Sequence, residues 1–129
     1  MKESIRKHIL KWVEDNIYSL TSIDVLVQEL GYSRRTIETW FRHWYQQPVG
    51  EYILKRRISR AAILLRMTSL PVTEIAFLFH YHSSQGFSRS FKKYTGLMPS
   101  EYRTSAVWDF NKLQPSLLLE NYSIPDVKL

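Results

Sequence analysis

The strongest constraint on the fold is an internal repeat, because a chain that contains one unit twice is expected to fold that unit twice. When the sequence is compared with itself at an offset of 49 residues, apolar and aromatic positions coincide from residue 23 onward. After one inserted residue the offset becomes 50, and the agreement continues to Tyr52 and Tyr102. The other matched pairs are Ile23 with Val72, Leu26 with Ile75, Val27 with Ala76, Leu30 with Phe79, Tyr32 with Tyr81, Ile37 with Phe87, Phe41 with Phe91, Arg42 with Lys92, Trp44 with Tyr94 and Glu51 with Glu101.

Each copy, about 32 residues long, has the pattern of a helix-turn-helix. A short apolar stripe with helical spacing comes first and a punctuated turn follows, where Gly31 can take the left-handed conformation. A longer amphipathic helix is then expected over 34–45 in the first copy and over 84–95 in the second. Ser33 and Ser83 suit the N-caps of these helices. The sequence therefore predicts an all-α fold with two helix-turn-helix subdomains.

A long linker helix is expected between the two copies, which gives about seven helices in all, followed by a short irregular C-terminal tail. Pro48 suits the first turn of a helix over 48–67, and residues 4–19 are expected to form an opening helix. Twenty helical residues span about 30 Å, close to the roughly 34 Å between successive major grooves on one face of B-DNA. The expected parts are 1–47 for the N-terminal helix and first helix-turn-helix, 48–69 for the linker helix, 70–103 for the second helix-turn-helix and 104–129 for a C-terminal extension.

The C-terminal extension is too apolar for a solvated tail. Two interpretations stay open: it folds back to cover apolar surface of the domain, or it is the remnant of, or docking site for, a second domain. Its apolar residues are Trp108, Phe110, Leu113, Leu117, Leu118, Leu119, Tyr122 and Ile124.

Positive charge is concentrated in the middle of the chain. The formal net charge is +6 and the isoelectric point is about 9.7. Residues 31–103 carry twelve basic and four acidic side chains, whereas 1–30 and 104–129 each carry one more acidic than basic side chain. This distribution indicates a polyanionic partner.

Several classes of chemistry are not expected. The chain has no cysteine, and its four histidines have no cluster of carboxylates beside them, so we predict no metal site and no cofactor. No Gly-rich phosphate loop, nucleophile elbow or paired carboxylates are present, so we predict no enzymatic activity. No apolar run has the length of a signal peptide or membrane span, which favours a cytoplasmic protein without a membrane partner.

The exposed faces expected on the two second helices carry side chains suited to DNA. Arginine can bond guanine O6 and N7, glutamine suits adenine, and threonine can contact the thymine methyl group. The predicted base-edge contacts are Arg35, Thr36, Thr39, Gln85 and Arg89, and the wider predicted DNA-binding set adds Arg34, Glu38, Arg42, Ser84, Gly86, Lys92 and Lys93. The candidate phosphate contacts are Ser33, Ser83, Lys55, Arg56 and Arg57. One polar helix face is usually just solvated, but two equivalent faces flanking such positive charge favour DNA reading.

The residues of the second copy form a recognisable signature. They are Ile75-Ala76, Tyr81, Phe87-Ser88-Arg89, Phe91-Lys92, Gly96, Pro99-Ser100 and Tyr102-Arg103. With these motifs, residues 22–103 resemble the DNA-binding domain of the AraC/XylS family of bacterial transcription regulators. The opening helix, with Trp12-Val13-Glu14-Asp15-Asn16-Ile17, is similar to that of the short, stand-alone members of the MarA, SoxS and Rob type.

The resemblance implies a monomeric transcription activator on double-stranded DNA, with an asymmetric site of roughly 20 bp, two half-sites one helical turn apart. It also implies an interaction with RNA polymerase and a role at stress, efflux or drug-resistance genes. Many family members carry an effector-binding or dimerising domain as well, and this chain is expected to lack one.

Several positions depart from the family pattern: Arg34-Arg35 and Glu38-Thr39 in the first copy, Ser84-Gln85-Gly86 in the second, and His80 and Met98. Glu38 either accepts from a cytosine amino group or faces away from phosphate. Gly86 lets the backbone approach DNA closely but lowers helix propensity. His80 stands where glycine is usual, so the turn is expected to be strained or differently closed. Met98 stands where a threonine or serine N-cap is usual.

A second function hypothesis therefore stays open. Glu38, Gly86 and the apolar extension motivate a protein-interaction adaptor that keeps the helix-turn-helix fold but binds polymerase or another regulator without reading DNA. A repressor, or a fragment of a longer ligand-responsive regulator, would share the DNA contacts and differ in output.

Overall fold

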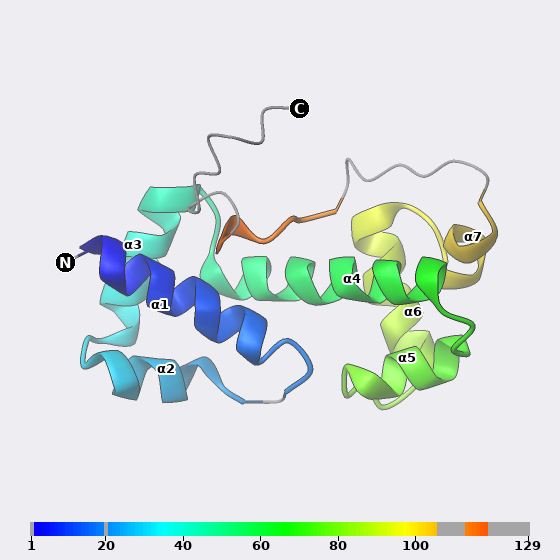
Figure 1. Cartoon of the computed structure of the whole chain (residues 1–129), viewed down its shortest axis with the longest axis horizontal. Helices are drawn as coiled ribbons and strands as arrows, with labels where there is room; N and C mark the ends of the chain where they lie inside the picture. The colour runs from blue at the N-terminus through cyan, green and yellow to red at the C-terminus, as the bar shows by residue number, and fades with distance from the viewer. Residues whose placement is uncertain (1, 20, 106–112, 119–129) are drawn as a thin grey trace.

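The computed structural model describes residues 2–19, 21–105 and 113–118, and the seven helices found there confirm the all-α prediction (Figure 1). They are α1 (Lys2–Asp15), α2 (Ile23–Leu30), α3 (Arg34–Tyr45), α4 (Val49–Met67), α5 (Val72–Leu78), α6 (Ser84–Thr95) and α7 (Pro99–Thr104). The two helix-turn-helix units are α2–α3, the first unit, and α5–α6, the second unit. None of the described helices combines the length and apolarity needed to cross a lipid bilayer.

Two hydrophobic cores lie at the two ends of α4, which connects them as the axis of the molecule (Figure 1). Val49 and Tyr52 join a core built with α1, α2 and α3, whereas Ile58 and Leu65 join a core built with α5, α6 and α7. With 19 residues, α4 is about 28 Å long. The linker helix therefore belongs to both cores and connects them.

Two helices have boundaries that differ from the prediction. The opening helix spans Lys2–Asp15 instead of 4–19, and just after it the Asn16 side-chain amide donates to the Trp12 carbonyl (2.9 Å) where the chain turns. Pro48 lies at the N-cap of α4 instead of in its first turn, with extended backbone (φ −64°, ψ 145°). Its carbonyl accepts from the Tyr52 N–H (3.1 Å) and so closes the first turn of α4.

Residues 113–118 return across α4 to the first core. Leu117 is buried there, and its N–H donates to the Tyr52 hydroxyl (3.1 Å), while the Gln114 N–H donates to the Ser59 hydroxyl (2.7 Å). Burial raises the pKa of Tyr52. These contacts support the folded-back interpretation for this segment. Leu113 and Leu118 also belong to the described segment. The remaining apolar residues of the extension lie outside the described residues, and they are Trp108, Phe110, Leu119, Tyr122 and Ile124.

Candidate nucleic-acid interface

The recognition helices α3 and α6 begin with the same local device. Ser33 and Ser83 are the N-caps, and their hydroxyl oxygens accept from the N–H groups of Thr36 (3.1 Å) and Gly86 (3.2 Å). Both helices also end at a left-handed C-cap residue. The predicted helices over 34–45 and 84–95, and both predicted serine caps, are confirmed.

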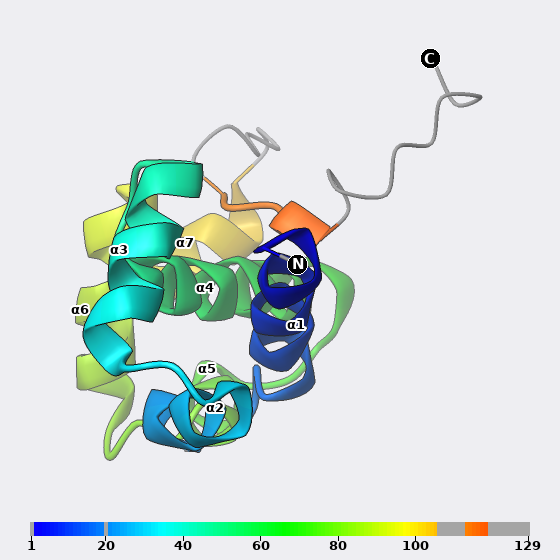
Figure 2. The same ribbon diagram turned by 90° about the vertical axis from the view of Figure 1, so that its left-hand side faces the viewer.

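Buried apolar side chains determine which face each recognition helix presents. Ile37 and Phe41 of α3, like Phe87 and Phe91 of α6, are completely buried in their cores. The opposite face of each helix therefore points to solvent. Viewed along the length of the molecule, α3 and α6 lie on the same side of α4, and α1 lies on the other (Figure 2). One surface of the protein thus carries both recognition helices.

Most residues of the predicted DNA-binding set lie on this surface. The exposed ones are Arg34, Arg35, Glu38, Thr39 and Arg42 of α3 and Gln85, Arg89, Lys92 and Lys93 of α6, while Thr36, Ser84 and Gly86 are partly buried. His43 was outside the predicted set, although it is exposed and helps to line a hollow of about 370 Å³ on α3 with Arg35 and Arg42. Its position eight residues after Arg35, two helical turns later, was the sequence signal for it.

The first recognition helix carries a chain of ion pairs. The Arg34 guanidinium donates to Glu38 (Nε–Oε1, 3.0 Å) and to Asp24 of α2 (Nη1–Oδ1, 3.2 Å). The hydrogen bond to Glu38 and the charge of Asp24 raise the pKa of Arg34. Two carboxylates therefore balance one cation at the start of α3, and Glu38 points along its own helix toward Arg34.

The second recognition helix has a different electrostatic character. Its cations are Arg89, Lys92 and Lys93, and its sequence contains no acidic residue. Within the described part of the chain, no ion pair involves a side chain of α6, and the Lys93 ammonium lies over the Tyr94 ring at 5.8 Å. All three charges of α6 are therefore available to an anion.

The basic run of α4 does not have the placement predicted for phosphate contacts. Arg56 is buried and forms a two-pronged ion pair with Glu14 of α1 (2.6 and 3.0 Å). Arg57 is half-buried and donates to two backbone carbonyls. Lys55 is partly exposed and pairs with Glu51 one turn earlier (3.1 Å). The prediction that Arg56 and Arg57 contact phosphates is therefore corrected. Both are structural residues, because their guanidinium groups donate to other parts of the protein.

The two unusual cap positions are accommodated in different ways. His80 is left-handed (φ 63°), and its ring bonds to the Tyr18 carbonyl, so the turn is closed by a side-chain contact. At the start of α7, the Met98 N–H donates to the Glu101 carboxylate (3.1 Å), which supplies the N3 half of a capping box.

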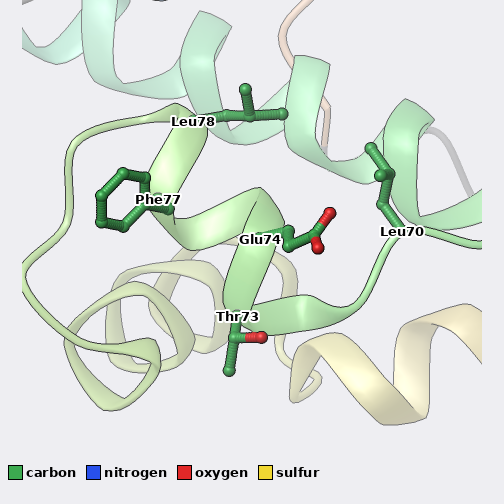
Figure 3. Close-up of a pocket in the computed structure, with 5 residues that line it drawn as sticks. All are labelled: Leu70, Thr73, Glu74, Phe77 and Leu78. Atoms are coloured by element: carbon green, nitrogen blue, oxygen red, sulfur yellow. The ribbon is translucent and has the colours of Figure 1, made fainter.

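An exposed apolar surface on α5 was not predicted. Phe77 is 80% exposed and Leu78 is 43% exposed. With Leu70, Thr73 and Glu74 they line a hollow of about 450 Å³, and Leu78 points toward α4 while Phe77 points away from it (Figure 3). The sequence signal for this surface was the position of Phe77 and Leu78 outside the buried stripe of α5.

A family model described as "Helix-turn-helix domain" matches residues 26–105, which contain both units. The chain is 40% identical over 104 residues to the HTH-type transcriptional activator AarP of Providencia stuartii, with 81% of this chain and 77% of AarP covered. This chain is a member of the AraC/XylS family.

Two further AraC/XylS proteins extend the comparison. The chain is 41% identical over its full length to YkgA of Escherichia coli, a putative HTH-type transcriptional regulator, of which it spans 54%. The crystal structure of a transcriptional regulator of the AraC type from Chromobacterium violaceum covers 89% of this chain and is itself covered to 99%, with a TM-score of 0.72 and 26% identity. The chain thus corresponds to nearly all of one relative and to about half of another.

Proposed function

We propose that the protein is a sequence-specific transcription activator that binds double-stranded DNA as a monomer and reads two adjacent major-groove segments. The observation that carries this proposal is the shared orientation of α3 and α6, whose polar and cationic faces point outward on one side of α4. The length of α4, about 28 Å, is compatible with two grooves roughly 34 Å apart.

The exposed residues divide into two roles. Arg35 and Thr39 in α3, and Gln85 and Arg89 in α6, are the proposed base-edge contacts, because they are exposed and lie in the first half of each helix. Arg42 of α3 with Lys92 and Lys93 of α6 lie in the last turns and are suited to phosphates, which position the protein without reading sequence. Lys55, Ser33 and Ser83 stay candidate phosphate contacts, and Arg34 with Glu38, Thr36, Ser84 and Gly86 complete the proposed interface.

The activating output is supported by the name of AarP, a transcriptional activator. It requires an interaction with RNA polymerase, which the family resemblance implies, together with stress, efflux or drug-resistance promoters. A protein that acts on bacterial promoters works in the cytoplasm, and we place it there.

A random-duplex selection with the full chain tests the proposal. We expect enrichment of one asymmetric motif with two half-sites about one helical turn apart. The Arg35→Ala/Arg89→Ala double variant is the matched control, and its motif should lose the preference at one position in each half-site because each recognition helix has lost its bidentate donor. If the unaltered chain enriches no motif, DNA reading is contradicted.

The protein-interaction adaptor is a second candidate function, and the exposed apolar surface of α5 favours it. The two functions separate in a transcription assay with purified polymerase on a promoter that carries the selected motif. Phe77→Ser should lower activation without weakening DNA binding if an activator uses this surface for a protein partner. An adaptor would lose its partner with the same substitution and would show no motif in the selection.

A further inference from the structure

The loop that follows α1 contacts the turn of the second unit, although the two are far apart in sequence. The Nε2–H of His80 donates to the Tyr18 carbonyl (2.7 Å), and the Tyr18 and Phe79 rings lie 5.1 Å apart. In Figure 1 this loop and the C-terminal end of α5 face each other beside α4. The second helix-turn-helix unit is therefore attached to the N-terminal part of the chain, through the loop between α1 and α2, as well as through the linker helix.

Arg57 strengthens this attachment from the middle of α4. One guanidinium nitrogen donates to the Ser19 carbonyl (2.8 Å) and another to the Phe79 carbonyl (2.7 Å). The guanidinium also lies over the Phe79 ring at 5.7 Å. Burial lowers the pKa of Arg57, which shows that this cation is partly withdrawn from water. A single side chain thus bonds both to the loop between α1 and α2 and to the turn of the second unit.

His80 occupies a backbone conformation that favours glycine. Its φ is 63°, and the equivalent residue of the first unit, 49 positions earlier, is Gly31 with φ 75°. A Cβ at Gly31 would meet nothing within 4 Å, so open space surrounds the equivalent position of the first turn. A left-handed backbone is strained for a non-glycine residue, and such strain is typical of sites where the side chain has a function. Here the side chain reaches the other unit.

The location of this contact affects the second recognition helix directly. His80 is three residues before Ser83, the N-cap of α6, and α4 alone would allow one unit to twist or bend relative to the other. A hydrogen-bonded contact away from the axis of α4 opposes that motion. We propose that His80, supported by Arg57, is a positioning residue that fixes the orientation of α6 relative to α3 and so sets the spacing between half-sites that the protein accepts.

This inference rests on the proposed DNA reading and is tested on the motif that the selection yields. Inserting or deleting 1 bp between the half-sites rotates one against the other by about 34° and shifts it by about 3.4 Å. For the unaltered chain we expect the affinity to fall about tenfold or more on either altered site. For His80→Gly we expect a fall of about threefold or less, with affinity for the original site nearly retained.

Glycine fits the left-handed backbone, so His80→Gly is expected to fold as stably as the unaltered chain. His82→Gly is the matched control, because it removes an exposed histidine of the same turn. It should leave unchanged the ratio between the affinities for the original and the altered sites. Arg57→Lys, which keeps the charge but cannot bridge both carbonyls, should lower this ratio as His80→Gly does. Strict spacing that persists in His80→Gly would overturn the inference while leaving DNA reading intact; a chain that selects no motif at all would overturn both.

Discussion

The two helix-turn-helix units share their buried residues and caps but differ in their surfaces. In the first unit α2 packs beside α1, with His8 close to Glu29 (3.3 Å), whereas the equivalent outer face of α5 exposes Phe77 and Leu78. In the first unit Arg34 is paired with two carboxylates, whereas α6 carries three cations and no acid. The two copies thus share the residues that fold the unit and differ in the residues on its surface. The two recognition helices, the two heads of the protein on DNA, should therefore contribute differently to affinity and to sequence preference.

The largest expected effect is that of salt. With roughly six to ten phosphates neutralised, log K should fall against log[salt] with a slope of about −5 to −9. Replacing Lys92 and Lys93 by Gln should make the slope less steep by about 2, whereas Arg34→Gln should change it by less than about 1, because Glu38 and Asp24 already balance that charge. Fluorescence anisotropy over a salt series measures all three. A flat dependence, or equal changes for both variants, would contradict the comparison.

The next effect concerns base reading in each head. Arg35→Ala and Arg89→Ala should each cost about 1–3 kcal/mol of binding and relax preference at one position, in different half-sites. Competition binding against a library of single-base variants measures this. An equal loss on every sequence would reassign that arginine to a phosphate.

Gly86→Ala tests whether the second head approaches DNA more closely than the first. A Cβ there would meet Ser83 Oγ at 3.6 Å and Tyr81 Cδ1 at 3.7 Å, which are ordinary contacts, so alanine fits the fold. We expect a gain of about 0.5–1 kcal/mol in the free energy of unfolding. DNA binding should weaken by about 1 kcal/mol or more if the backbone lies against the groove.

The mirror change, Thr36→Gly, is the control for this experiment. It should lower the stability of the first unit and bring no gain in DNA affinity. Denaturant unfolding and anisotropy measure both variants, and unchanged DNA affinity in Gly86→Ala would show that α6 does not need its glycine.

The smallest expected effect comes from Glu38. Glu38→Gln removes one negative charge from the proposed DNA-facing surface and leaves Arg34 with Asp24 as its remaining charged partner, so affinity should rise about two- to fivefold. Ser88→Ala, at the equivalent position of α6, should leave affinity nearly unchanged. A loss of affinity in Glu38→Gln, confined to sites with one particular base, would instead identify Glu38 as a base contact.

Local and periodic features of this fold could be predicted from the sequence. The stripes of Ile37 and Phe41, and of Phe87 and Phe91, together with the two serine caps, fixed both recognition helices at the observed residues. These features depend only on neighbours within a few turns, which a sequence shows directly.

Long-range contacts explain the incorrect part of the prediction. Lys55, Arg56 and Arg57 are consecutive in sequence, but successive helical positions differ by about 100°, so they face three directions. Arg56 faces Glu14, 42 residues earlier, and Arg57 faces the carbonyls of Ser19 and Phe79. No local pattern reveals those partners. The exposed apolar surface of α5 was not predicted either. Apolar side chains are usually expected to be covered by another segment, and no other described segment covers Phe77 and Leu78.

The central claim is that both heads occupy successive major grooves at once, and guanine methylation interference on the selected site tests it most directly. The account predicts two clusters of interfering positions about 10 bp apart on one face of the duplex, one lost in Arg35→Ala and the other in Arg89→Ala. A single cluster, or two clusters on opposite faces of the duplex, would contradict it.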